Sequence, residues 1–171
     1  MLFRILTTLA SSLVLLGVQG TAVLADPPPA PAAAPDAVAA FVGPSSWSHA
    51  APNTADPSRT VEQWHISGGD TSLVFIRDST TAYDAAIGAI VKNFTTNNIK
   101  PSINRDVPCR GKTSHIVQFS IGPDGHQIVI NRLVVPDGTG VDTVTYARPA
   151  DAAFDPDVKK SEATFCGVTT L

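Results

Sequence analysis

The run TSHIVQFSIGPDGHQIVINRLVVPDGTGVDTVTYAR, residues 113–148, decides the fold. It contains three stretches rich in apolar residues, separated by turn sequences at 122–125 (GPDG) and 136–140 (PDGTG). The first stretch alternates with the period of two that is typical of a strand, and the middle stretch is apolar on both faces. Turns of glycine, proline and aspartate join consecutive strands as hairpins. The run therefore predicts three consecutive antiparallel strands.

Strand patterns also occur upstream of this run. Residues 60–67 (TVEQWHIS) alternate, and residues 72–78 (SLVFIRD) are apolar on both faces, so we predict two strands joined by a glycine-containing turn. Residues 99–107 are polar and contain Pro101, which cannot donate a ladder hydrogen bond, and this predicts a strand at the edge of the sheet. We also allow for one more strand around Trp47.

Two helices are predicted, one in the middle of the chain and one near its end. Apolar residues recur at spacings of three and four over residues 83–94, and we expect Thr81 and Asp84 to form a capping box at the start of this helix. The short second helix opens with Asp155 as its N-cap and Pro156 at its first helical position. The resulting order, β-β-α-β-β-β-β-α, predicts an α+β fold with a mainly antiparallel β-sheet and helices packed on its faces.

This order of elements resembles the PsbP-like fold, an antiparallel sheet with helices on both faces that occurs in photosystem extrinsic proteins and in small bacterial lipoproteins of the LpqN type. The resemblance is carried by Trp47 and Trp64 in the opening strands, the helix at 83–94 and the closing helix at 155–166. Proteins of that fold mostly act in binding or assembly, so the resemblance implies a non-catalytic function. The chain differs from the lipoproteins because it has no cysteine positioned to carry a lipid.

The first 25 residues are typical of a secretory signal peptide. Arg4 is the one charged residue before Asp26, and an apolar centre is followed by Val23-Leu24-Ala25, which fits a signal-peptidase site. We expect cleavage between Ala25 and Asp26, which predicts a secreted or periplasmic protein. The alternative is a retained membrane anchor, but a span needs about 20 strongly apolar residues and several polar residues interrupt this stretch.

The remaining chain is predicted to be a tether followed by one domain. Residues 26–40 contain five prolines and seven alanines, so we predict a semi-rigid tether over residues 26–44 and a single α+β domain over residues 45–171. After the predicted leader, no apolar stretch approaches the length that spans a membrane. The chain carries 12 lysines and arginines against 15 aspartates and glutamates, a formal net charge of −3. Because nucleic-acid binding needs a basic surface, we expect no nucleic-acid partner.

The two cysteines, Cys109 and Cys166, are predicted to form a disulfide, because two cysteines in an oxidising compartment usually pair. The chain-entropy model assigns a bridge across such a long loop about 4 kcal/mol. The competing interpretation is a reactive thiol at Cys109 next to Arg110 and His115, which would supply the positive setting and the base that a thiolate needs.

Sequence motifs assign no catalytic residue, metal ligand or cofactor. No HExxH, G-x-S-x-G or phosphate-binding loop is present in the sequence. We therefore expect a non-catalytic binding or assembly module for a protein or small ligand, bound on one sheet face or at the strand-end loops. The alternative is a small secreted hydrolase in which His65, His115 and His126 converge from separate strands, with His49 as the fourth histidine of the chain.

Overall fold

The structure is a computed structural model that describes residues 40–67 and 69–170. The predicted signal peptide, its cleavage site between Ala25 and Asp26, and the predicted tether up to residue 39 lie outside the described residues. In the described part of the chain, no helix is both long enough and apolar enough to cross a membrane.

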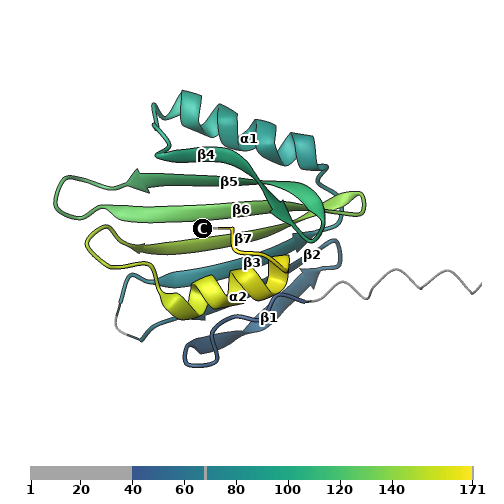
Figure 1. Ribbon diagram of the computed structural model, residues 1–171, viewed down its shortest axis with the longest axis horizontal. Coiled ribbons are helices and arrows are strands. Elements are labelled where there is room, and N and C mark those ends of the chain that lie inside the picture. Colours follow the sequence, from purple (N-terminus) through teal and green to yellow (C-terminus); the bar gives the residue numbers. More distant parts are fainter. Residues whose placement is uncertain (1–39, 68, 171) are drawn as a thin grey trace, which may run out of the picture. The chain divides into compact units, whose positions relative to one another are not determined.

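Seven strands and two helices follow one another in the order β-β-β-α-β-β-β-β-α (Figure 1). The elements are β1 (Ser48–Asp56), β2 (Arg59–His65), β3 (Ser72–Asp78), α1 (Tyr83–Thr96), β4 (Ile103–Cys109), β5 (Lys112–Ile121), β6 (Ile128–Asp137), β7 (Gly140–Pro149) and α2 (Pro156–Cys166). They form one sheet in the order β1-β2-β3-β7-β6-β5-β4, with every neighbouring pair antiparallel. The predicted α+β class and antiparallel sheet are confirmed.

The order contains one strand more than the predicted β-β-α-β-β-β-β-α, namely β1, which follows Trp47 and corresponds to the further strand allowed for around that residue. All of its residues are exposed, and its pairing with β2 shifts register between Ala50 and Asn53 and again before Asp56. An exposed, irregular edge strand has no apolar alternation, so its sequence carries no strand pattern. The strand therefore forms because β2 supplies its hydrogen-bond partners. At the other edge of the sheet lies β4, which confirms that an edge strand occurs here. The strand begins later than the predicted residue 99, so Pro101, on which the prediction rested, lies before it.

The sheet has a core on each face, as neighbouring residues of β6 show. Successive side chains of a strand point to opposite faces. Val135 belongs to the cluster that contains Val158 and Phe165 of α2, whereas Val134 belongs to the cluster that contains Ile90 and Phe94 of α1. The middle strand of the predicted hairpins is apolar on both faces because a helix packs on each of them.

The domain begins earlier than predicted, because Phe41 lies in its core. Phe41 is buried, and its ring lies 5.6 Å from that of Trp64, 5.5 Å from that of Phe75 and 5.6 Å from that of Phe165. A side chain at Gly43 would collide with the Trp64 indole. The predicted tether boundary at residue 44 is therefore wrong. Phe41 follows an alanine- and proline-rich stretch, but its ring packs between three aromatic rings that are far apart in the sequence.

The start of α1 also differs from the prediction. Its N-cap is Ala82, which makes no side-chain capping bond, so the predicted capping box of Thr81 and Asp84 is wrong. The Thr81 hydroxyl instead donates to Asp78 at 2.8 Å, and Asp78 also accepts bonds from the Thr80 amide and hydroxyl and from the Thr81 amide. These four bonds hold the pKa of Asp78 well below its usual range. The connection from β3 to α1 is thereby ordered by the aspartate that ends β3.

The start of α2 is as predicted. Asp155 is the N-cap, and its side chain accepts hydrogen bonds from the backbone amides of Asp157 and Val158. Pro156 occupies the first helical position, where its missing N–H costs no hydrogen bond. Gly167 ends the helix in the left-handed conformation that favours glycine.

Candidate functional site

Cys109 and Cys166 form the predicted disulfide, with an S–S distance of 2.03 Å. The bond joins the last residue of β4 to the last residue of α2. The Arg110 amide, next to the bridge, also donates to the Cys166 carbonyl at 2.9 Å. Because both cysteines are bonded, the alternative of a reactive thiol at Cys109 is wrong for the folded protein.

The histidines proposed for a hydrolase lie on separate parts of the domain. His65 ends β2 and His115 lies in β5, four strands apart in the sheet, or roughly 19 Å at the usual strand spacing. His126 lies in the turn between β5 and β6. Within residues 40–67 and 69–170, no group of three histidine, cysteine, aspartate or glutamate side chains is placed to hold a metal ion. The structure does not bring the three histidines together.

Two of the four histidines have structural partners. His115 places one ring nitrogen 2.8 Å from an Asp106 carboxylate oxygen and the other 2.7 Å from the Asn104 side-chain oxygen. His49 stacks on the Trp64 indole, with ring centroids 4.5 Å apart, and lies 3.3 Å from a carboxylate oxygen of Glu62. These contacts bind edge strands to their neighbours.

A buried ion network lies on the α2 face of the sheet, near the start of β7. The Asp142 carboxylate is fully buried and accepts two bonds of 2.9 Å from Arg77 and one of 3.0 Å from Arg110. A second carboxylate, that of Asp137, lies 3.5 Å from Arg77 and 3.6 Å from Arg110. The Arg110 guanidinium also lies over the Phe165 ring, 5.3 Å from its centroid. Each charge has a partner inside the network, so it supports the fold.

Glu162 is a buried carboxyl group on the inner side of α2. Its side chain lies with Val158 and Phe165 among the buried residues of the helix, and one carboxyl oxygen has no hydrogen-bond partner in the described part of the chain. Burial raises the pKa of Glu162 to about 7. The neutral form is thereby favoured in the folded protein.

We expect Glu162→Gln to flatten the pH dependence of stability. Unfolding exposes the carboxyl group to water, where its pKa returns to 4.5, so the folded chain holds a proton that the unfolded chain releases between pH 4.5 and about 7. At about 1.4 kcal/mol per pKa unit, this group lowers the free energy of unfolding by roughly 3 kcal/mol across that interval, and the loss is complete above it. Urea unfolding at several pH values measures the slope.

The exposed variant Asp124→Asn is the control, because its residue lies in the turn between β5 and β6. It should leave the slope unchanged. A Glu162→Gln profile parallel to that of the wild type would contradict the buried-carboxyl explanation.

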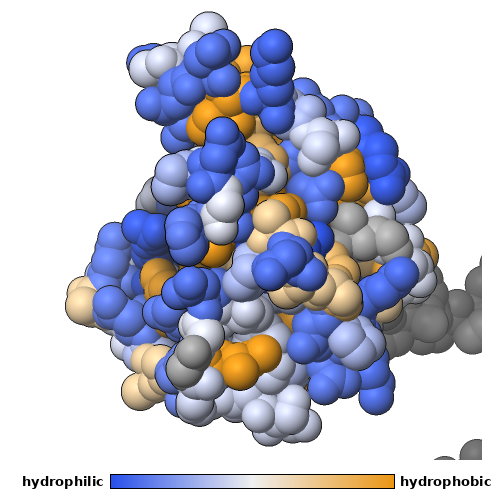
Figure 2. Space-filling view, turned by 90° about the vertical axis from the view of Figure 1, so that its left-hand side faces the viewer, coloured by the Kyte–Doolittle hydropathy of each residue, from blue (hydrophilic) through white to orange (hydrophobic). Residues whose placement is uncertain are grey.

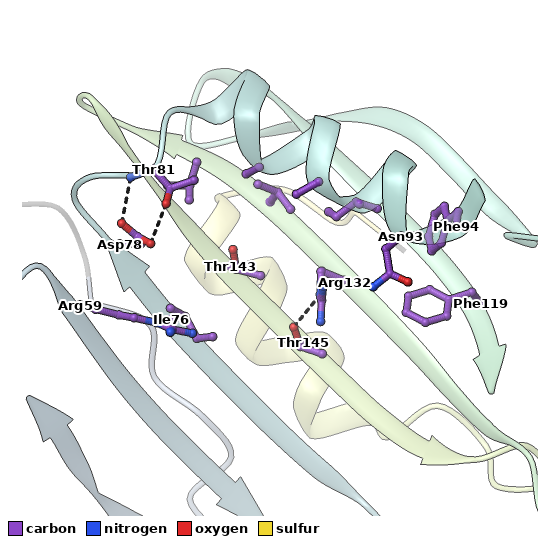
Figure 3. Close-up of a pocket in the computed structure, with 15 residues that line it drawn as sticks. Arg59, Ile76, Asp78, Thr81, Asn93, Phe94, Phe119, Arg132, Thr143 and Thr145 are labelled. Atoms are coloured by element: carbon purple, nitrogen blue, oxygen red, sulfur yellow. Dashed lines mark hydrogen bonds between the residues drawn. The ribbon is translucent and has the colours of Figure 1, made fainter. Parts of the chain in front are cut away.

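A cavity of about 340 Å³ lies between α1 and the sheet, on the face opposite α2 (Figure 3). Its floor is formed by Arg132 of β6, Thr143 and Thr145 of β7, and Ile76 of β3, which the register places side by side on one face. The helix contributes Ala89, Ile90 and further small or apolar side chains, together with the Asn93 amide. The walls therefore combine core side chains with a few polar groups, as in ligand pockets generally.

Arg132 is the charged residue on the floor of this cavity. Its Nε donates to the Thr145 hydroxyl at 3.2 Å, and no carboxylate of the described residues lies within 4 Å of its guanidinium. Burial lowers the pKa of Arg132, since it disfavours the charged form. Figure 3 shows its side chain beside Thr145, with Asn93 and Phe94 reaching down from α1. The sequence carried one signal for it: a cation in the centre of a strand that is apolar on both faces.

A larger hollow of about 590 Å³ is lined by turn residues such as Asp70, His126 and Asp151. Most of its walls are exposed loop side chains. On the face drawn in Figure 2, hydrophilic residues dominate and apolar residues form separate small areas. The cavity under α1 is the better candidate site, because strands and a helix of the core position its side chains.

Comparisons with known proteins add little to this geometry. No protein-family model matches the sequence, and no curated protein matches it. Among solved structures, the chain is similar to a protein of unknown function from Pseudomonas aeruginosa, a suggested regulator, at 14% identity and a TM-score of 0.42. The alignment covers 54% of this chain and 69% of the other. So weak a likeness supports no conclusion about family or function, and the resemblance to PsbP-like proteins stays a prediction.

Proposed function

We propose that the protein is an extracytoplasmic, non-catalytic binding module that holds a small ligand in the cavity between α1 and the sheet. The observation that carries this proposal is the guanidinium of Arg132, which lies on the cavity floor without a carboxylate partner in the described residues. Arg132 is half-buried, and removing a charge from water is costly unless the charge is paired. A ligand in the cavity would supply the missing partner.

The lining chemistry favours binding over catalysis. The cavity contains the hydroxyls of Thr143 and Thr145, but neither histidine nor cysteine is among its lining residues. Its one carboxylate, that of Asp78, is occupied by hydrogen bonds from Thr80 and Thr81. A hydroxyl nucleophile needs an adjacent general base, which these residues do not supply. The hydrolase alternative rests on three histidines that lie far apart, and no observation of the structure favours it.

The extracytoplasmic location is supported by two independent features. The sequence of residues 1–25 is typical of a signal peptide and predicts export, with cleavage between Ala25 and Asp26. The disulfide between Cys109 and Cys166 is compatible with an oxidising compartment, where such bonds persist. Intact-mass measurement of the exported protein tests this part of the proposal, and a mass that includes residues 1–25 would contradict it.

We expect Ala86→Trp to abolish binding of a neutral apolar probe such as phenylnaphthylamine. Ala86 lines the cavity from α1 and is half-buried against the core under this helix, so an indole there would occupy the space of the ligand. Fluorescence titration should show one probe bound per wild-type chain and none in the variant. The tryptophan side chain is large and rigid and would exclude a ligand by its volume. The loss of binding should therefore not depend on the polarity of the probe.

The matched control is Val91→Trp, on the same helix. Val91 is 49% exposed and does not line the cavity. This variant should bind the probe like the wild type. Equal loss of binding in both variants, or undiminished binding in Ala86→Trp, would contradict a ligand site under α1.

A further inference from the structure

We propose that the ligand is an organic monocarboxylate whose apolar body fills the cavity and whose carboxylate binds Arg132. This inference rests on the proposed binding function and names the ligand class. It depends on three features of the cavity: a free guanidinium fork, apolar walls, and a charge balance that leaves one cation uncompensated.

The first feature is the unused hydrogen-bonding capacity of Arg132. Only its Nε has a partner, the Thr145 hydroxyl, so both terminal nitrogens are without one among the described residues. Arg77 and Arg110, by contrast, donate to the Asp142 carboxylate. Two parallel N–H groups of a guanidinium match the two oxygens of a carboxylate. Arg77 pairs with Asp142 through its Nε and one terminal nitrogen, whereas Arg132 has its two terminal nitrogens available for a carboxylate of a ligand.

The second feature is the apolar part of the lining. Ile90 and Phe94 of α1 face Phe119 of β5 and Val134 of β6 across one end of the cavity, and the rings of Phe94 and Phe119 lie 5.1 Å apart. A simple inorganic anion would leave these apolar side chains exposed to water. An organic acid with an aliphatic or single-ring body would cover them, and a cavity of about 340 Å³ is at the small end of the range for such ligands.

The third feature is the charge balance of the lining. The cavity contains two arginines, Arg59 and Arg132, and one carboxylate, that of Asp78. Asp78 lies directly opposite Arg59 in the pairing of β2 with β3, and its oxygens accept bonds from Thr80 and Thr81. No ion pair within 4 Å joins these two side chains. Counted over the lining, two cations stand against one anion, which matches a ligand with a single negative charge.

The test compares octanoate with octanamide, a neutral molecule of nearly the same shape, by titration calorimetry. Wild-type protein should bind one octanoate per chain and bind octanamide more weakly. Arg132→Gln should weaken octanoate binding about ten- to a hundredfold, as expected for loss of hydrogen bonds to a charged group, and leave octanamide binding unchanged. Arg132→Lys keeps the charge without the fork, so its affinity for octanoate should lie between those of wild type and Arg132→Gln.

Controls separate this inference from the proposed function. Lys92→Gln removes an exposed cation from α1 outside the cavity and should change nothing, and thermal melts should show that both Arg132 variants fold. If phenylnaphthylamine binds but octanoate does not, or if octanoate binds wild type and Arg132→Gln equally, the carboxylate inference is overturned while the binding function stands. Displacement of octanoate by inorganic phosphate at equal concentration would show a simple anion site and also overturn it. Failure of every probe would overturn both.

Discussion

Replacing Asp142 by asparagine is expected to lower the free energy of unfolding by about 3–5 kcal/mol, the usual cost of breaking a buried ion pair. The Asp142 side chain is fully buried and accepts hydrogen bonds from both Arg77 and Arg110. An amide has the same shape but no charge, and its NH₂ group would face an arginine donor. Two guanidinium groups would then lose their principal partner while remaining largely covered.

Urea unfolding of Asp142→Asn and Asp137→Asn measures this effect against a matched control. Asp137 contacts the same two arginines, but at 3.5 and 3.6 Å and with its side chain 20% exposed. Its replacement should cost about 1 kcal/mol or less, as for ion pairs near the surface. Equal losses in the two variants would contradict the expectation that the buried Asp142 contributes more to stability than the partly exposed Asp137.

The double replacement of Cys109 and Cys166 by serine should lower the free energy of unfolding by up to about 4 kcal/mol. The two cysteines are 57 residues apart in sequence, so the bond removes many conformations from the unfolded chain. It also attaches α2 to β4, and an 11-residue helix is marginal without external contacts. We therefore expect α2 to lose hydrogen-exchange protection before the central strands do.

Chemical unfolding of the wild type with and without a thiol reductant provides the comparison. The reduced wild type should match the double serine variant, and the variant itself should not respond to the reductant. If reduction leaves the wild type as stable as before and exchange in α2 unchanged, the bridge does not stabilise the helix.

Elements with local signals were determined by the sequence alone. The two hairpins that join β5, β6 and β7 follow from strand patterns bounded by GPDG and PDGTG turns. Asp155 and Pro156 mark the start of α2 because capping involves only adjacent residues. The disulfide was predictable because a chain with two cysteines permits only one internal pairing.

Where two local interactions compete, the sequence pattern alone misled. Thr81 and Asp84 have the spacing of a capping box, yet the Thr81 hydroxyl donates to Asp78. Both arrangements satisfy the same hydroxyl. The pairing of β3 with β2 and β7 places Asp78 at the end of the strand, within hydrogen-bond distance of Thr81.

Only the tertiary structure decided the candidate site and the buried ion network. Arg77 and Asp142 are 65 residues apart and meet because β3 pairs with β7, while Arg132 becomes a cavity residue because α1 packs over β6 and β7. In the same way, Phe41 becomes a core residue by filling a gap between three distant rings. The physical reason is that strand order and helix placement depend on the total apolar surface that long-range contacts bury. The buried apolar surface comes from residues throughout the domain, so no short stretch of sequence predicts the strand order or the helix placement.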